Sequence, residues 1–146
     1  HHVPLLARWP GKVTAGSKCA TTVCLTDLFA TCADVAGGKL SDEAAPDSFS
    51  LVKMLKGEMA QRGAPVIHHS AAGMFAIRDG KWKLIAGNGS GGREAPKGKP
   101  FGLPYQLYDL SNDIGETKNL IEQEPEVAKR LEDKLDEIRS SGRSRN

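Results

Sequence analysis

The chain has 146 residues, of which 39% are hydrophobic and 26% charged, so we expect it to fold around a core. Its 20 Lys and Arg against 18 Asp and Glu leave a net charge of +2, which argues against a dedicated nucleic-acid binder. No apolar run reaches the roughly 18 residues of a membrane span. Three cysteines are too few, and odd in number, for a disulfide scaffold.

The first residue is His1 rather than Met, and no signal-peptide pattern follows it. The natural start is therefore expected to lie upstream. His1 and His2 are compatible with native sequence or with a purification tag.

The first third of the chain predicts one strand and two helices. Val3–Gly11 is a short apolar run closed by Pro-Gly, which is typical of a buried strand. Helical spacing between Thr21 and Ala36 predicts an amphipathic helix, capped by Thr21 or Thr22 and ended by the Gly pair at 37–38. Its apolar face would consist of Leu25, Leu28, Phe29, Cys32 and either Val35 or Ala36. A second short helix is expected within 47–57.

After Gly63 the period of the pattern changes from 3.6 to 2, which predicts a small sheet. Strands are expected over 64–70, 74–78, 81–85 and 106–110, with a hairpin at Asp79-Gly80 and with Trp82 and Leu84 on one face. Residues 87–104 would form a long irregular loop. A final helix over 125–139 carries an apolar stripe of Val127, Leu131, Leu135 and Ile138, and a frayed tail follows from Gly142.

These elements predict an α+β fold: a small antiparallel four-stranded sheet with a packed C-terminal helix, preceded by a strand and helices from an incomplete α/β domain. The expected boundary separates residues 1–62, the end of a larger domain, from residues 63–146.

The two adjacent histidines, His68 and His69, form the most chemically suggestive pair. Neighbouring strand residues face opposite sides, so both imidazoles cannot bind one metal. Either one could reach a cleft and donate to an anion, or it could be hydrogen-bonded within the fold. Arg78, Lys81, Lys83, Lys97 and Lys99 form a modestly basic edge that would suit an anionic ligand or simply face solvent.

Other patterns carry less chemistry. Residues 87–92 read G-x-G-x-x-G, but Pro96 forbids the helix that a dinucleotide site needs. Cys24 and Cys32 are interpreted as small apolar core residues, and the cysteine spacing fits no zinc pattern. Asp109, Asp113 and Glu116 are interpreted as a loop with Asx turns. No G-x-S-x-G elbow is present. From the residues alone, no catalytic or metal-binding residue is assigned.

The order of several blocks resembles the C-terminal part of type I sulfatases, the arylsulfatase family of the alkaline phosphatase superfamily. The blocks are the Val3–Lys12 segment, Thr26–Thr31 followed by Ala36-Gly37, Pro46–Leu51 with Leu55–Gly57, Ala76–Ile85, and Leu107–Leu110 followed by Asp113, Glu116, Asn119-Leu120 and Pro125-Glu126. Together they span residue 3 to about residue 138.

The resemblance implies that the parent protein hydrolyses a sulfate ester, aryl or carbohydrate, using calcium and a formylglycine made within C-x-P-S-R or S-x-P-x-R. Cys19, Cys24 and Cys32 lack that context, so the chain is expected to be an inactive C-terminal fragment without cofactors. His68, His69 and the 87–104 loop would help to shape the substrate cleft. The resemblance also implies a periplasmic or secreted location.

Two alternatives remain open at this point. One is a stand-alone module that binds anionic glycans, and the other is part of a related phosphoester hydrolase. Loss of a larger domain would expose apolar surface and favour self-association of the chain. No nucleic-acid partner and no membrane span are expected.

Overall fold

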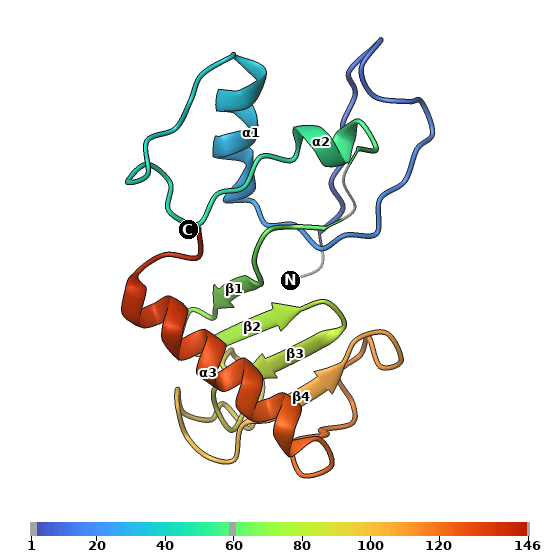
Figure 1. Cartoon of the computed structure of the whole chain (residues 1–146). Helices are drawn as coiled ribbons and strands as arrows, with labels where there is room; N and C mark the ends of the chain where they lie inside the picture. The colour runs from blue at the N-terminus through green and yellow to red at the C-terminus, as the bar shows by residue number, and fades with distance from the viewer. Residues whose placement is uncertain (1–2, 59–60, 146) are drawn as a thin grey trace. The chain divides into compact units, whose positions relative to one another are not determined.

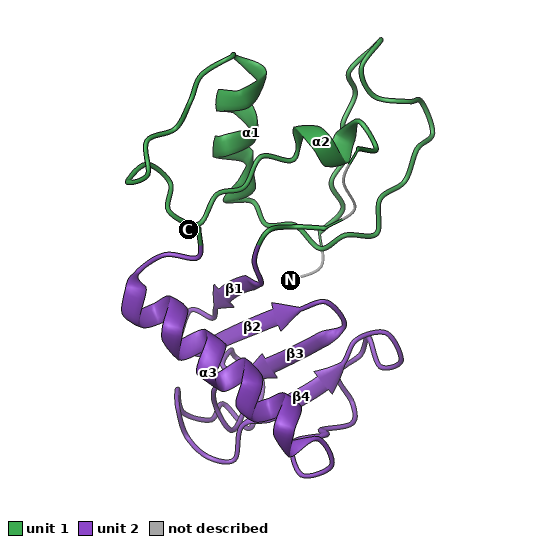
Figure 2. Ribbon diagram, viewed as in Figure 1, with its two compact units in different colours: residues 1–63, 145–146 green, residues 64–144 purple. Residues whose placement is uncertain are grey.

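A computed structural model describes residues 3–58 and 61–145. The chain divides into two compact units, residues 1–63 with 145–146 (unit 1) and residues 64–144 (unit 2), coloured separately in Figure 2. No helix within the described residues is long and apolar enough to cross a membrane.

Unit 2 is an antiparallel sheet with one long helix (Figure 1). Its strands are β1 (Val66–His69), β2 (Phe75–Asp79), β3 (Trp82–Ile85) and β4 (Gln106–Asp109), in the spatial order β1-β2-β3-β4. The helix α3 (Pro125–Ser141) contacts β2 and β3. The expected four-stranded α+β architecture with a C-terminal helix is confirmed.

The core of unit 2 follows from strand alternation. Ile77 pairs with Leu84, and Leu84 pairs with Leu107, so one residue from each of three strands points to the same face. Leu131 and Leu135 of α3 pack against this row, and all five side chains are 0–2% exposed. Trp82 lies on the same face as Leu84, as predicted. Burial of this row is the main stabilising contribution in unit 2.

The β2–β3 hairpin differs by one residue from the expected turn. Asp79 still pairs with Trp82, so the two loop residues are Gly80 and Lys81 rather than Asp79 and Gly80. Gly80 has a φ of 58°, a conformation that glycine adopts without steric cost. Asp79 also forms an ion pair with Arg130 of α3 at 2.7 Å.

Unit 1 contains two helices, α1 (Asp27–Val35) and α2 (Val52–Leu55), both shorter than expected. The predicted strand over 3–11 is not formed, and the first element in the described part of the chain is α1. A strand is defined by pairing with a neighbour, and no described segment pairs with this one. The caps expected at Thr21 or Thr22 are also wrong, because α1 begins at Asp27 after Thr26.

The buried face of α1 is the opposite of the predicted one. Asp27, Ala30 and Thr31 are buried, whereas Leu25, Leu28, Phe29 and Val35 are 40–72% exposed. Cys32 is exposed too, and Cys24 precedes the helix, so the prediction that both are core residues on the helix is wrong. Periodicity identifies the apolar face of a helix, but it does not show that the chain supplies a surface to cover that face.

The expectation of a frayed tail from Gly142 is wrong as far as Arg145, because Arg145 is hydrogen-bonded within unit 1. Gly142 ends α3 with a φ of 69°. The backbone N–H of Arg145 then donates to the Pro46 carbonyl at 2.9 Å, and its guanidinium donates to the carbonyls of Ser41 at 2.6 Å and Ala44 at 2.9 Å. With the Asp42 carbonyl at 3.4 Å, four backbone acceptors hold this basic residue in unit 1.

Candidate functional site

The two histidines of β1 lie on opposite faces of the sheet, as strand alternation predicted. His68 pairs with Ala76 and His69 pairs with Phe75. His69 thus shares the face of Phe75 and Ile77, on which α3 packs, whereas His68 lies on the other face. The structure does not bring the two imidazoles together.

His68 lies in a half-buried, positively charged environment. Burial lowers the pKa of His68 below its ordinary value, and the nearby Lys83 ammonium lowers it further, while Glu116 opposes the shift. Lys83 itself donates to a Glu116 carboxylate oxygen at 2.6 Å. The His68 imidazole is consequently biased toward the neutral form, in which one ring nitrogen donates and the other accepts.

His69 belongs to an exposed cluster of rings. Its Nδ1 donates to the Ser70 carbonyl at 2.9 Å, which directs Nε2 away from that bond. The imidazole centroid lies 5.5 Å from that of Phe75, and the Phe75 centroid lies 6.0 Å from that of Phe101. The Arg139 guanidinium carbon lies 5.1 Å and 4.4 Å from these two phenyl centroids. We call His69, Phe75, Phe101 and Arg139 the Arg139 platform.

The segment over 87–104, expected to be irregular, is tightly hydrogen-bonded. The Asn88 amide joins its two limbs, since Oδ1 accepts from the Lys99 N–H at 2.9 Å and Nδ2 donates to the Leu103 carbonyl at 3.0 Å. Gln106 of β4 donates to the carbonyls of Gly87 and Gly89 at 2.9 and 3.0 Å. The loop is therefore attached to the sheet as a defined structure.

The glycines of this loop serve close backbone contact. A Cβ atom on Gly89 would lie 2.5 Å from the Gly98 nitrogen, and one on Gly98 would lie 2.5 Å from the Gly89 nitrogen. Only glycine fits where two backbones approach so closely. Residues 88–104 are all described and contain no helix, which agrees with the interpretation that G-x-G-x-x-G is not a dinucleotide site here.

The interpretation of Asp109, Asp113 and Glu116 as a loop with Asx turns holds only in part. Asp109 is the buried last residue of β4, Asp113 forms a turn after it, and Glu116 pairs with Lys83. Asp109 accepts hydrogen bonds from Lys81, Ser111 and Asn112. The bond from Lys81 is the main reason why the pKa of Asp109 lies well below its usual range. Asp113 accepts from the backbone N–H groups of Lys118 and Thr117, which lower its pKa. These carboxylates are thus engaged in local structure.

A metal site is not formed by these side chains. Among the described residues, no group of three or more His, Cys, Asp or Glu is arranged to hold a metal ion. The described residues therefore offer no ligand set for the calcium that the resemblance implies for the parent enzyme, and no chemistry is assigned to a metal here.

The basic sheet edge is largely paired. Lys81 and Lys83 form ion pairs with Asp109 and Glu116, and Arg78 donates to the Gly80 carbonyl at 3.4 Å. Lys97 and Lys99 are exposed on the glycine-rich loop. Among the five basic residues predicted to suit an anion, Lys97 and Lys99 are therefore the two that lie outside the sheet and form no side-chain ion pair within the described part of the chain.

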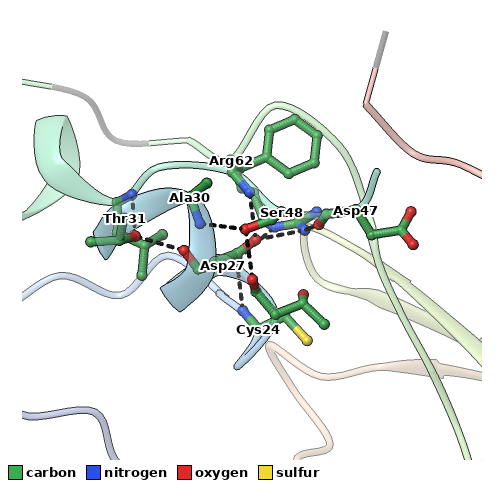
Figure 3. A network of polar contacts seen from close by, with 10 residues as sticks. Cys24, Asp27, Ala30, Thr31, Asp47, Ser48 and Arg62 are labelled. Carbon is green, nitrogen blue, oxygen red and sulfur yellow. Dashed lines mark hydrogen bonds and ion pairs between the residues drawn. The ribbon is translucent and has the colours of Figure 1, made fainter. Parts of the chain in front are cut away.

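A buried polar network in unit 1 escaped the sequence analysis (Figure 3). Arg62 donates from Nε and Nη2 to the two carboxylate oxygens of Asp27, each at 2.9 Å, and its guanidinium carbon lies 4.3 Å from the Phe49 centroid. The Asp27 carboxylate also accepts from the backbone N–H groups of Cys24 and Phe49. Four donors saturate this carboxylate, so we assign it a structural role.

Two hydroxyl groups extend the same network. Ser48 accepts from the Ala30 N–H at 2.8 Å and donates to the Thr26 carbonyl at 2.6 Å. Thr31 donates to the Asp27 carbonyl at 2.7 Å and accepts from the Leu51 N–H at 2.9 Å. The bonds connect α1 with the segment before α2. Arg62 follows Asp27 by 35 residues, and no periodic or motif signal connects the two.

An antiparallel sheet covered by a single C-terminal helix defines an α+β unit. Comparison with known proteins shows which proteins the chain is related to. No protein-family model matches the chain. It is 30% identical to an N-acetylgalactosamine-6-O-sulfatase of Bacteroides thetaiotaomicron over 94% of the chain and 27% of that protein. It is 30% identical to mouse arylsulfatase K over 94% of the chain and 25% of that protein.

A solved structure supports the same relationship. A protein from a study of glycosaminoglycan metabolism in Bacteroides thetaiotaomicron superposes with a TM-score of 0.65 at 29% identity, over 78% of this chain and 24% of that one. The chain is therefore homologous to part of the sulfatases and spans about a quarter of the length of the relatives it matches.

Proposed function

We propose that this chain is the C-terminal part of a sulfuric ester hydrolase and forms one wall of its substrate cleft. The observation that carries the proposal is the homology to sulfatases over 94% of the chain. The chemistry of a sulfatase would come from calcium and a formylglycine, for which the described residues offer neither a metal cluster nor the cysteine context. We therefore infer that the isolated chain does not turn over sulfate esters.

Within that wall, either His68 or His69 is the proposed substrate contact, because the two side chains lie on opposite faces of the sheet. The exposed His69 imidazole has a nitrogen directed away from its bond to Ser70 and can contact a ligand oxygen. His68 is biased toward the neutral form by burial and by Lys83, so it would act as a hydrogen-bond partner rather than as a cation. The ordered 87–104 loop is the third proposed contributor.

The test uses the full-length parent enzyme and steady-state kinetics with an aryl sulfate. Either His68→Ala or His69→Ala, whichever side chain faces the cleft, should raise KM and leave kcat nearly unchanged, because it would remove binding that is equal in the ground state and the transition state. Arg130→Ala, on the exposed face of α3, is the matched control. Unchanged KM values in both histidine variants would remove the proposed contacts.

The substrate and the location of the parent follow from the same relationship. Sulfate esters of aryl compounds or of carbohydrates are the proposed substrates, and a periplasmic or secreted location is proposed with them. Secretion of the full-length protein, followed with an antibody against unit 2, would test the location.

A second candidate is a stand-alone module that binds anionic glycans without hydrolysis. The observation that favours it is the partly exposed Arg139 platform, in which a guanidinium contacts two phenyl rings. The exposed Lys97 and Lys99 add positive charge to the glycine-rich loop. The reading frame upstream separates the two candidates. A C-x-P-S-R block there supports the enzyme, whereas a start codon immediately before His1 supports the module.

A further inference from the structure

The Arg139 platform is assembled from four separate segments of unit 2. His69 ends β1, Phe75 begins β2, Phe101 lies in the glycine-rich loop and Arg139 lies in the last turns of α3. The side chains are only partly covered, since Phe101 is 39% exposed and the Arg139 side chain is also 39% exposed. Rings and a cation thus meet at a surface that solvent reaches.

The loop holds Phe101 in one defined place. Its backbone N–H donates to the Ala86 carbonyl at 2.8 Å, next to the Gly87–Pro100 bridge. Phe101 has a φ of 57°, which is costly for a residue with a side chain and persists only where the surroundings determine it. The ring is therefore presented by a rigid scaffold, which reduces the ordering cost of binding.

The Arg139 guanidinium lies over two phenyl rings, and the N–H groups at its edge can donate to an anion. The guanidinium contacts phenyl groups at 4.4 and 5.1 Å, and its Nη1 donates to Asp136 at 3.2 Å. This pair with Asp136 is exposed and so holds the guanidinium only weakly. A stacked guanidinium still points its N–H donors outward in the plane, the geometry that binds a tetrahedral oxyanion through two bonds.

We propose that the Arg139 platform binds a sulfated sugar residue, with Phe101 contacting the apolar face of the ring and Arg139 binding its sulfate. His69 would donate or accept at a hydroxyl beside the sulfate. The choice of a sulfated sugar as ligand class rests on the proposed function, whereas the platform itself rests on the contacts above. Binding here needs no covalent step.

The test is a titration of the full 146-residue chain followed by ¹H–¹⁵N NMR. N-acetylgalactosamine 6-sulfate should give saturable shifts around residues 69, 75, 101 and 139. Unsulfated N-acetylgalactosamine should bind about five- to ten-fold more weakly, the effect of losing one charge-assisted contact. Equal affinity for the two sugars, or no saturable shift at all, would overturn the proposal.

Two variants separate the roles of the ring and the cation. Arg139→Gln should weaken the sulfated sugar about five- to ten-fold and leave the unsulfated one unchanged. Phe101→Leu, which keeps an apolar side chain in the loop, should weaken both sugars. Arg130→Gln on the same helix is the matched control and should change neither. A loss of affinity in Arg130→Gln equal to that in Arg139→Gln would contradict a specific platform.

The outcome stays separate from that of the proposed function. Binding is measured on this chain without turnover, whereas the hydrolase proposal is tested by the kinetics of the parent. Turnover by the parent without sugar binding to this chain would refute the platform alone. Binding with no activity in the parent would refute the hydrolase instead.

Discussion

The longest helix of each unit is anchored by a different kind of interaction, apolar packing in unit 2 and an ion pair in unit 1. Unit 2 buries an apolar row, in which Ile77, Leu84 and Leu107 are covered by α3. Unit 1 buries an ion pair of Asp27 with Arg62, while Leu28 and Phe29 of its longer helix remain exposed. The contrast teaches that the same helical periodicity marks a core in one unit and an uncovered surface in the other.

The largest expected effect is in the polar network of unit 1. Asp27→Ala leaves the Arg62 guanidinium buried without its counter-charge, and removal of one partner from such a pair costs about 3–5 kcal/mol. Hydrogen exchange read residue by residue should show lost protection in unit 1, with unit 2 unchanged. Glu43→Ala, which removes an exposed carboxylate of unit 1, is the control. Equal protection in Asp27→Ala and wild type would contradict the role given to this pair.

The next effect is in the apolar core of unit 2. Leu131→Ala should lower its free energy of unfolding by about 2–5 kcal/mol, because it opens a cavity against the sheet. Denaturant unfolding followed by Trp82 fluorescence, in a Trp9→Phe background, measures this. Val127→Ala, at the partly buried end of the same stripe, should cost less. The comparison fails if the two substitutions are equally destabilising.

A smaller effect concerns pH. Because the pKa of His68 is lowered in the folded state, the unfolded chain binds more protons just below pH 6.5. Stability of unit 2 should therefore be fully present above that pH and should fall as the pH drops below it. His68→Gln should flatten this part of the profile. Identical profiles for His68→Gln and wild type would exclude the assigned environment.

The smallest effect on stability is expected on the exposed face of α1. Phe29→Asp should change the free energy of unfolding by no more than about 0.5 kcal/mol, because the side chain is 60% exposed. It should nevertheless reduce self-association of the chain, since a charge interrupts the apolar surface. Size exclusion followed by light scattering measures the masses of the wild-type chain and of the variant in solution. A wild-type chain that runs as a monomer at all concentrations would refute self-association.

Sequence reasoning succeeded where structure is set by short-range pattern. Period-2 alternation predicted the four strands, and it placed Trp82 and Leu84 on one face and the two histidines on opposite faces. The apolar stripe that contains Leu131 and Leu135 predicted α3 and its buried side. Each of these features depends on residues within a few positions of one another or on adjacent strands.

It failed where the partner is distant in the sequence or where an apolar face stays exposed. Asp27 and Arg62 are 35 positions apart, and neither residue type indicates burial. The platform escaped for the same reason, because Phe75, Phe101 and Arg139 come from different elements. The large apolar residues predicted to form the buried face of α1 stay exposed, and so do most apolar residues of the 3–11 segment.

The most direct test of the account is a turnover assay on the isolated chain. We predict that the purified chain, incubated with 4-nitrophenyl sulfate and calcium, releases nitrophenol no faster than buffer does. The reason is that the described residues contain no group of side chains arranged to bind a metal ion and no formylglycine motif. The full-length parent, assayed in parallel, should release it readily. Turnover by the chain alone, retained after repurification and lost on denaturation, would contradict the account.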